Sequence, residues 1–407
     1  MSNSVYRRCG CRDESGKQLG KNCPKIKSDP KHGTWEYRLS HGSDPKTGQR
    51  RQFRTGGFAT KRAAESALAD QKVKLDKGTY IKPSEVTLGE YAPKWLPHRE
   101  TTGNGLRATT VAGYDHYVRH DIDSSALGGM KLTEIRRFHV AQFVTELSKA
   151  GRGAVTVRRI MTLLQTILNS AVRAELIGAN PAQGADRPKL DKDPVNPWEP
   201  EQARIFLDRC AQHRLGPLFE IVILTGLRRG EITGLRWSDV DLVTRKITVR
   251  RNRVTANGRV LEQATTKTKA GLRTVPMSDF AVATLLAWQL RQARESEAAA
   301  EAWQTQGHVF TMADGRPLNP TYVTRLFHKF SQDLPPLTFH GLRHCAASLM
   351  LSSGADIAVV SKLMGHKSIA ITADVYGHLV GTVATDTVNR AANLIAHTVH
   401  THEAVAP

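Results

Sequence analysis

A proline-rich segment, Arg187–Pro200 (RPKLDKDPVNPWEP), divides this chain and limits how it can fold. Its four prolines cannot donate backbone hydrogen bonds, so neither a helix nor a central strand can run through the segment. We therefore predict an extended linker at residues 186–200, with separately folded parts on both sides of it. A chain of 407 residues is long enough for about two to four domains.

The chain carries a large and unevenly placed excess of positive charge. It has 58 Lys and Arg against 38 Asp and Glu, a formal net charge of +20. Residues 1–80 contain 18 basic and 8 acidic residues, so this fifth of the chain holds +10, half of the excess. Such a charge favours a polyanionic partner: nucleic acid first and an anionic membrane surface second, with a merely soluble basic protein as the alternative.

The sequence argues against a membrane-embedded or secreted protein. It contains no run of about 18 apolar residues that could span a bilayer. The basic N-terminus has no apolar stretch after it and so lacks the pattern of a secretory signal. Five cysteines in 407 residues do not make a disulfide scaffold and fit a reducing cytosol. We therefore expect a cytoplasmic protein that does not span a membrane.

Residues 1–80 are predicted to form a small β-rich module. Trp35–Leu39 alternates as a strand does, Gly42–Gly48 supplies turn residues, and Arg50–Phe53 can form a second strand. An Ala-rich helical pattern follows at Lys61–Asp76. A twisted sheet with basic faces can read a DNA groove, which makes this module a candidate DNA-binding element.

Three cysteines of this module could bind a metal. Cys9, Cys11 and Cys23, with His32 or His41 downstream, could ligate zinc as a Cys3His set. Their spacing, C-x-C and then eleven residues to the third cysteine, matches no common zinc finger. The alternative is that they are unpaired thiols in a partly ordered loop.

Residues 87–185 are predicted to be all-helical. Val140–Leu147 and Ile160–Ala171 carry apolar residues at the i, i+3, i+4, i+7 positions of amphipathic helices. Two further helices are indicated before them, one with a face that contains Leu88 and Trp95 and one capped by Thr109 or Thr110. Four helices of this size predict a compact bundle.

The last 210 residues combine helices with a small antiparallel sheet. Leu218–Leu224 is an apolar helix that ends at a glycine, which can present Arg228 at the end of a buried helix. A strand is predicted at Lys246–Val254, followed by an Asn-Gly hairpin turn and a return strand at Arg259–Gln263. Another strand can lie at Arg273–Met277.

This part also holds five short motifs that carry six chemically versatile side chains. They are Arg228 in TGLRRGE, Lys267 in TTKTKAGLRTVP, His340 and Arg343 in HGLRH, His366 in LMGHKS, and Tyr376 in YGHL. In order and approximate spacing they resemble the motifs of the tyrosine recombinases, and the chain is similar to phage-type integrases of actinobacterial mobile elements. Each motif alone recurs by chance, whereas six matches in order are specific.

The resemblance implies a reaction that needs neither a metal nor another cofactor. Tyr376 would attack the scissile phosphate, giving a 3′-phosphotyrosine and a free 5′-hydroxyl. Arg228 and Arg343 would clamp the phosphate oxygens with planar guanidinium groups, a geometry that Lys lacks. His340 would hydrogen-bond the phosphate or accept the tyrosyl proton, and His366 would donate to a non-bridging oxygen.

The resemblance also implies roles for two further residues in this reaction. Lys267 would protonate the leaving 5′ oxygen, and Lys269 is its rival because residues two apart on a strand point to the same face. We favour Lys267. Glu231, one turn beyond Arg228, matches the supporting acidic position of the family and could orient an arginine.

Several neighbours of the motifs are predicted to be structural. His344 and His378 are expected to be ordinary, satisfied histidines, and Cys345 a small buried helix residue with no base beside it. Thr385–His397 has the pattern of an amphipathic helix. The resemblance implies that such a tail packs on a neighbouring protomer, and the alternative is a terminal helix on its own domain.

The predicted fold is therefore multidomain α+β. It comprises a β-rich arm-type DNA-binding module (1–80), a helical SAM-like core-binding domain (87–185), a linker (186–200), a mainly α catalytic domain with a small antiparallel sheet (197–395), and a tail (396–407). The resemblance implies a homotetramer on double-stranded DNA with core-type and arm-type attachment sites, with an excisionase or a host DNA-bending protein as further partners. DNA then replaces the membrane surface as the partner of the excess charge, so we expect a nucleoid-associated protein with no membrane partner.

Three other classes compete with a recombinase that integrates or excises a mobile element. A metal-dependent nuclease needs clustered carboxylates, and Asp239 and Asp241 have no third acid in a comparable setting. A type IB topoisomerase shares the catalytic logic but needs neither the basic module nor the linked bundle. A non-enzymatic DNA-binding regulator explains the charge but leaves the spaced motifs as coincidence.

Overall fold

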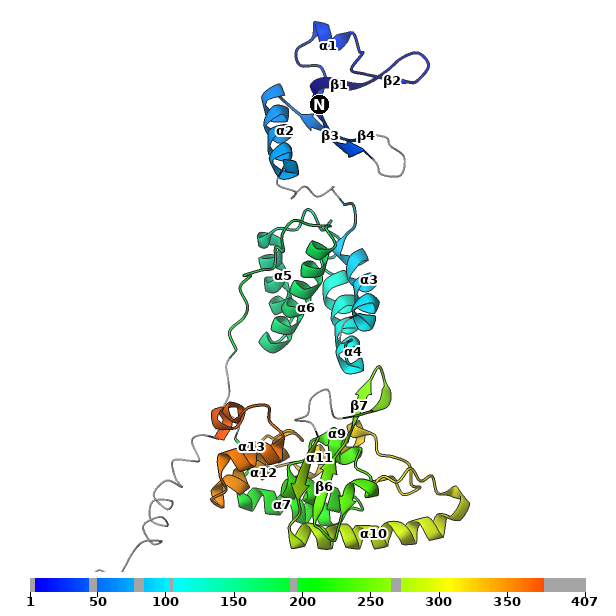
Figure 1. Cartoon of the computed structure of the whole chain (residues 1–407), viewed down its shortest axis with the longest axis vertical. Helices are drawn as coiled ribbons and strands as arrows, with labels where there is room; N and C mark the ends of the chain where they lie inside the picture. Colours follow the sequence, from blue (N-terminus) through cyan, green and yellow to red (C-terminus); the bar gives the residue numbers. More distant parts are fainter. Residues whose placement is uncertain are drawn as a thin grey trace, which may run out of the picture. The chain divides into compact units, whose positions relative to one another are not determined.

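The computed structural model describes residues 4–43, 50–76, 84–102, 105–190, 196–264 and 272–376 (Figure 1). The chain divides into two compact units, one of Met1–Leu106 with Gly113–Leu190 and the other of Arg107–Ala112 with Asp191–Pro407. In the described ranges, no helix combines the length and the apolar character that a membrane span requires.

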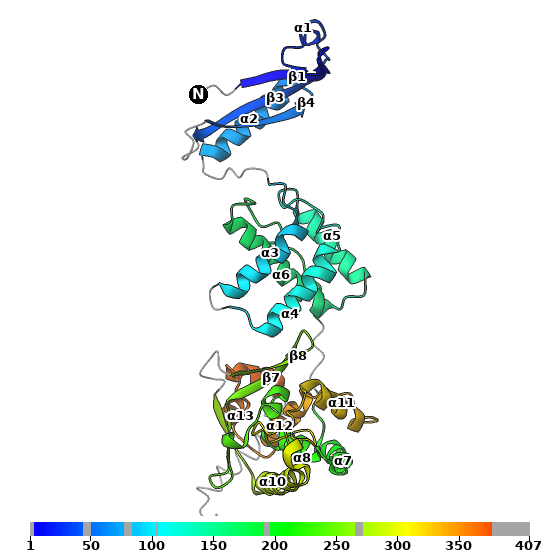
Figure 2. The same ribbon diagram turned by 90° about the vertical axis from the view of Figure 1, so that its right-hand side faces the viewer.

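The N-terminal module is a four-stranded antiparallel sheet with one long helix. Its strands pair in the order β2-β1-β3-β4, and the helix α2 lies along the sheet (Figure 2). The elements are β1 (Ser4–Arg12), β2 (Gln18–Gly20), α1 (Lys25–Ser28), β3 (Thr34–Ser43), β4 (Arg50–Phe58) and α2 (Lys61–Asp76). This confirms the two predicted strands and the predicted helix, while β1 was missed because its residues, SVYRRCGCR, do not alternate between apolar and polar.

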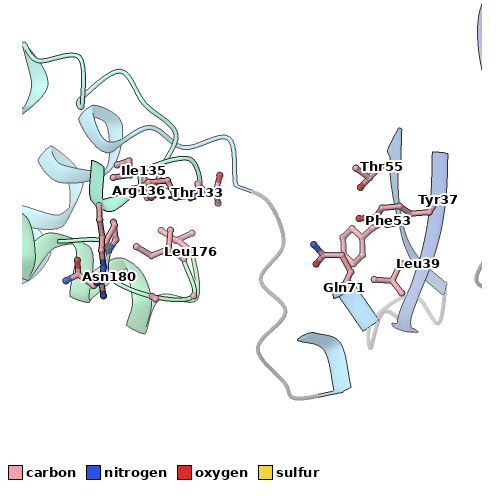
Figure 3. Close-up of a pocket in the computed structure, with 16 residues that line it drawn as sticks. Tyr37, Leu39, Phe53, Thr55, Gln71, Thr133, Ile135, Arg136, Leu176 and Asn180 are labelled. Carbon is pink, nitrogen blue, oxygen red and sulfur yellow. Dashed lines mark hydrogen bonds between the residues drawn. The ribbon is translucent and has the colours of Figure 1, made fainter. Parts of the chain in front are cut away.

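The core of the module is small. Buried Tyr37 and Leu39 of β3 pack against Leu68 of α2, with Val5, Phe58 and Ala67 at the margin. Figure 3 labels Tyr37 and Leu39 on the sheet and Gln71 from α2 on the same side of it.

The middle region is the predicted helical bundle. Its elements are α3 (Leu88–Thr101), α4 (Ala108–Tyr117), the short π-helix η1 (Val118–Asp123), α5 (Arg137–Lys149) and α6 (Ala154–Arg173). Thr87 and Glu90 form a capping box at the start of α3. After α6, Asn180, labelled in Figure 3, donates to the Gln165 carbonyl and the Asn169 side chain, which fixes this loop to α6.

One prediction for the bundle was wrong. Neither Thr109 nor Thr110 caps α4, because the helix already begins at Ala108. The backbone N–H groups of Thr110 and Val111 both donate to the Arg107 carbonyl, so the threonines lie inside the first turn.

The C-terminal part is mainly helical around a large aromatic core. Phe206, Phe219 and Phe327 have ring centroids 5.5 Å apart in the pairs Phe206–Phe219 and Phe206–Phe327, and all three are fully buried. The helices are α7 (Pro200–Ala211), α8 (Gly216–Thr225), α9 (Arg229–Thr233), η2 (Trp237–Asp239), α10 (Asp279–Ala299), η4 (Ala300–Ala302), α11 (Pro320–Phe330), α12 (Gly341–Ser352), α13 (Ile357–Met364) and residues 369–376.

The strands of this part form two separate pairings. The sheet β5-β6-β9 comprises Val240–Asp241, Lys246–Val249 and Arg273–Pro276, while β7 (Arg251–Ala256) and β8 (Arg259–Ala264) form a hairpin at Asn257-Gly258. The predicted continuous strand Lys246–Val254 is therefore wrong, since it breaks at Arg250. The break arises because β6 pairs with β9 and buries Ile247 and Val249, whereas β7 pairs with β8.

The end of the proline-rich segment is extended and packs on the aromatic core of the C-terminal part. Trp198 is 2% exposed; its backbone N–H donates to the Cys345 sulfur at 3.2 Å and its indole N–H to the Pro335 carbonyl at 2.8 Å. Trp198 thus anchors the start of this unit just before α7.

Candidate active site

The chain turn between α8 and α9 positions Arg228. Gly226 ends α8 in the left-handed region, at φ 65°, and a Cβ placed on it would lie 2.5 Å from Cε of Met364. Arg228 then caps α9, with its side chain 37% exposed. An apolar helix followed by Gly therefore predicted correctly that Arg228 lies at the end of a buried helix with a partly exposed side chain.

Glu231 is a buried carboxylate held between two arginines. It accepts from Arg228 Nη1 at 2.8 Å and, in a two-pronged pair, from both terminal nitrogens of Arg273 at 2.9 and 2.8 Å. Burial alone would raise the pKa of this carboxyl, but the hydrogen bonds and charges of Arg273 and Arg228 lower it to about 2. No pattern in the sequence indicated that Arg273, the first residue of β9, contacts Glu231.

Arg343 is almost fully buried without a carboxylate partner among the described residues. It is 2% exposed, and its guanidinium donates to the Gly226 carbonyl at 2.7 Å and to the Met364 carbonyl. Burial and the nearby charges of Arg228 and Arg273 lower the pKa of this guanidinium. Around these three arginines, the described residues supply the single carboxylate of Glu231, so the cluster carries two uncompensated positive charges and is suited to an anion.

Two histidines flank the arginines as neutral donors. His340 lies at the start of α12 and lines an open cleft of about 460 Å³ together with Arg228 and Arg253. Although His340 is an exposed residue, partial desolvation and the charges of its neighbours lower its pKa. His366 is half-buried and hydrogen-bonds the Thr372 hydroxyl at 2.8 Å, and desolvation followed by the charge of Arg343 lowers its pKa to about 4.

Tyr376 is buried in contact with a histidine that the sequence reading classed as structural. The tyrosine is 1% exposed, and its hydroxyl lies 2.5 Å from Nδ1 of His344. Burial raises the pKa of Tyr376, whereas burial and Arg343 lower the pKa of His344, so the hydrogen bond joins a neutral imidazole and a neutral phenol. The missed signal was helical spacing: His344 follows His340 by four residues, and their rings lie 5.2 Å apart on one face of α12.

The structure brings five of the six predicted catalytic residues into one neighbourhood. The charges of Arg228 and Arg343 act on both His340 and His366, and Arg343 also acts on Tyr376. Lys267 and its rival Lys269 lie outside the described residues, as do His378 and the predicted helix Thr385–His397. Cys345 is fully buried in α12, as predicted.

The carboxylates that a metal-dependent nuclease would need are engaged elsewhere. Asp239 is buried and pairs with Arg251, while Asp241 accepts from the backbone of Val243 and Thr244. Within the described ranges, no group of carboxylates has the spacing of a metal site. The described residues therefore do not support the alternative of a metal-dependent nuclease.

Comparison with known proteins finds one family match near each end of the chain. Residues 199–381 match the phage integrase family, and residues 25–75 match an arm DNA-binding domain. A XerC-like tyrosine recombinase of Caldanaerobacter subterraneus is 27% identical over 81% of this chain and 88% of its own length. The tyrosine recombinase XerC of Mycobacterium sp. (strain KMS) is 30% identical over 62% of this chain and 80% of its own.

Solved structures share the fold. The Tn1549 transposon integrase, in complex with a circular intermediate DNA, matches 75% of this chain and 100% of its own at 19% identity and a TM-score of 0.63. A lambda integrase tetramer bound to a Holliday junction matches 84% of this chain and 92% of its own at 19% identity and a TM-score of 0.54. The predicted fold class, a β-rich module, a helical region and a mainly α catalytic domain, is confirmed. The chain belongs to the phage integrase family and is a site-specific tyrosine recombinase.

Proposed function

We propose that this recombinase integrates or excises a mobile element by cutting and rejoining DNA at Tyr376. The observation that carries the proposal is the doubly positive arginine cluster, which lies within electrostatic reach of a tyrosine hydroxyl. A phosphodiester is an anion that gains negative charge on its non-bridging oxygens during attack. Fixed guanidinium and imidazole donors stabilise that charge more than they stabilise the ground state.

The residues divide the chemistry as follows. Tyr376 attacks phosphorus and releases the 5′-hydroxyl, and the resulting 3′-phosphotyrosine keeps the bond energy for rejoining. Arg228 and Arg343 bind the non-bridging oxygens, while His340 and His366 donate further hydrogen bonds to them. Glu231 and Arg273 act through Arg228 as positioning residues, since they fix it beside the Gly365 carbonyl, which its other terminal nitrogen contacts at 3.3 Å.

His344 has a separate role in this scheme. Its contact with the Tyr376 hydroxyl supports His344, ahead of His340, as the group that accepts the tyrosyl proton. This assignment leaves His340, which lines the open cleft with Arg228, for the phosphate.

The general acid is assigned to the segment between β8 and β9. Lys267 protonates the leaving 5′ oxygen, and Lys269 remains the rival. A substrate with sulfur in place of the bridging 5′ oxygen separates the two, because a thiolate leaves without a proton. The rate of the Lys267→Ala variant should recover on the sulfur substrate, and Lys269→Ala should cleave both substrates at equal rates. The reverse pattern would assign the role to Lys269.

The partners follow from the family and from the modular chain. Residues 1–80 bind arm-type sites and residues 87–185 grip one side of the core site, with the catalytic domain at 197–395 opposite. We propose that four protomers act on two duplexes, which the tetrameric assembly of the lambda integrase supports. An excisionase or a host DNA-bending protein would set the direction of the reaction.

A nicked suicide duplex of the attachment site tests the proposal. The full chain should form a covalent complex that survives denaturation and forms equally in EDTA, and Tyr376→Phe should form none. Tyr322→Phe, which changes a half-buried tyrosine of α11, is the matched control and should react as the wild type does. No complex with the wild type would favour a DNA-binding regulator, and relaxation of supercoiled DNA without strand exchange would favour a topoisomerase.

A further inference from the structure

Four side chains of the N-terminal module converge from three separate segments. Cys9 and Cys11 come from β1, Cys23 follows β2, and His32 precedes β3. Their ligand atoms all lie within 4.8 Å of one another, and all five cysteines of the chain have free thiols. Sequence reasoning left His32 and His41 as alternatives for the fourth ligand, and the structure brings His32 to the thiols.

The spacing of these atoms fits a tetrahedral metal site. Nε2 of His32 lies 3.4 Å from the Cys11 sulfur and 3.6 Å from the Cys23 sulfur. Around a tetrahedral zinc with ordinary bond lengths, adjacent S and N ligands lie about 3.6 Å apart and two sulfurs about 3.8 Å. The four atoms therefore surround a space of the size that one zinc ion fills.

The backbone is shaped to bring these residues together. β1 has an irregular register with β2 between Cys9 and Arg12, where the strand bends. Gly33 has φ +83° and approaches β1 so closely that a Cβ on it would lie 2.5 Å from the Arg8 carbonyl and 3.3 Å from Cβ of Cys9. This close approach places His32 beside the strand that carries two of the thiols.

Residues 13–33, which the four clustered side chains connect to β1, have almost no apolar core of their own. Among residues 13–33, which contain β2 and the single-turn helix α1, only Gly20 and Cys23 are buried. The apolar core of the module consists of residues from β1, β3, β4 and α2. A segment with so little apolar burial needs a cross-link such as a metal ion or a disulfide to hold one conformation.

We propose that Cys9, Cys11, Cys23 and His32 bind a structural Zn²⁺ ion that fixes residues 13–33 to β1. Three thiolates and a neutral imidazole form a closed four-ligand set, which is typical of structural and not of catalytic zinc. Binding releases the three thiol protons and leaves a site with one net negative charge, beside the basic Arg8. The site is independent of the recombination reaction, so its test needs no DNA.

The metal content of the full-length protein is the direct test. Protein purified from zinc-supplemented medium without chelator should hold about one Zn²⁺ per chain, and Cys23→Ser and His32→Ala should each lower this at least about tenfold. Cys210→Ala, which changes a buried thiol of α7, is the matched control and should keep its zinc. A full complement of zinc in Cys23→Ser, or no zinc uptake by the wild type during titration, would overturn the proposal.

A second measurement on the unaltered chain covers the case in which a variant fails to fold. Alkylation of the native protein, mapped by mass spectrometry, should modify Cys9, Cys11 and Cys23 only after a strong chelator is added. Cys210 and Cys345 are both buried and serve as internal controls that stay unmodified throughout. Equal modification with and without chelator, or a disulfide among the three cysteines, would contradict a zinc site.

Discussion

The catalytic unit and the N-terminal module hold their polar side chains in place by different means. In the catalytic unit, the arginines follow buried residues of a large apolar core that includes Phe206, Phe219 and Phe327, and Tyr376 is packed in a second buried apolar cluster with Met364. In the module, the core consists of a few residues under α2, and residues 13–33 lie outside it. Apolar burial thus supplies the rigidity of one region, while ligands to a single ion supply it in the other.

This difference means that the two regions should fail under different treatments. Chelation of the zinc should unfold part of the N-terminal module and leave the catalytic unit folded. Substitutions in the arginine cluster should affect the catalytic unit and leave the module unchanged. The predictions below run from the largest expected effect to the smallest.

Removal of the proposed zinc is expected to unfold residues 13–33. Structural zinc contributes about 10–16 kcal/mol of apparent binding free energy in small domains, more than the remaining contacts of this segment can replace. Hydrogen exchange of the full chain should show that amides of residues 13–33 lose protection on chelation, while those of α8 do not change. Unchanged exchange in residues 13–33 would mean that backbone contacts alone hold the segment.

Arg343→Lys is expected to slow covalent-complex formation by about 10²–10³-fold, the usual cost of one donor to a developing oxyanion. Lys keeps the charge but cannot donate to two carbonyls and a phosphate in one plane. The measurement is the single-turnover rate on the suicide duplex. Arg316→Lys, at an exposed site paired with Asp314, should react normally, and a normal rate for Arg343→Lys would remove this arginine from the mechanism.

Glu231→Gln is expected to destabilise the catalytic unit by about 3 kcal/mol, because it leaves the buried Arg273 without its counter-charge. The side chains of this pair are 4% and 6% exposed. Glu201→Gln breaks a pair with Arg204 whose side chains are 65% and 70% exposed, and should leave the free energy of unfolding almost unchanged because solvent screens the pair. Urea unfolding of both variants measures the contrast, and equal costs would contradict the role given to burial.

Low pH should remove the stabilisation that the ionised Glu231 carboxylate provides. The pKa of Glu231 is about 2 in the folded protein against about 4.3 in an unfolded chain, so the folded state favours the ionised form. The stabilisation is fully present above about pH 4.3 and is lost as the pH falls towards 2. The difference in unfolding free energy between wild type and Glu231→Gln should therefore narrow from pH 6 to pH 3. A constant difference would show that the pair does not depend on ionisation.

His344→Phe is expected to have the smallest effect, a loss of about fivefold in cleavage rate. Phenylalanine keeps the ring beside Tyr376 but removes the acceptor of its hydroxyl, and one hydrogen bond is worth about 1 kcal/mol. Cleavage rates across a range of pH, with binding of the same duplex as control, measure the change. If the rate and its pH dependence stay at wild-type values, His344 is only a packing residue.

Local sequence patterns predicted most elements because those elements depend on near neighbours. The periodicity of Ile160–Ala171 predicts the buried face of α6, and the Asn257-Gly258 pair predicts the hairpin of β7 and β8. Patterns failed where a distant partner decides the outcome. Strand alternation runs through Arg250, yet β6 and β7 take different partners on either side of it.

The candidate site divides in the same way. The five motifs predicted six side chains for the reaction, because such chemistry requires particular side chains in a particular order. The partners of those residues had no comparable signal: Arg273 lies 42 positions from Glu231 and His344 lies 32 from Tyr376. Only folding brings these pairs into contact.

The sequence by itself therefore determined the class of chemistry, the three-part order of the chain and the excess charge that suits DNA. These properties depend on residue identity and on spacing along the chain. The tertiary structure decided which charges are compensated, that Tyr376 is buried against His344, and that His32 joins Cys9, Cys11 and Cys23. Those outcomes depend on distances between residues far apart in sequence, which are fixed by packing of the apolar core and by the close approach of Gly33 to β1.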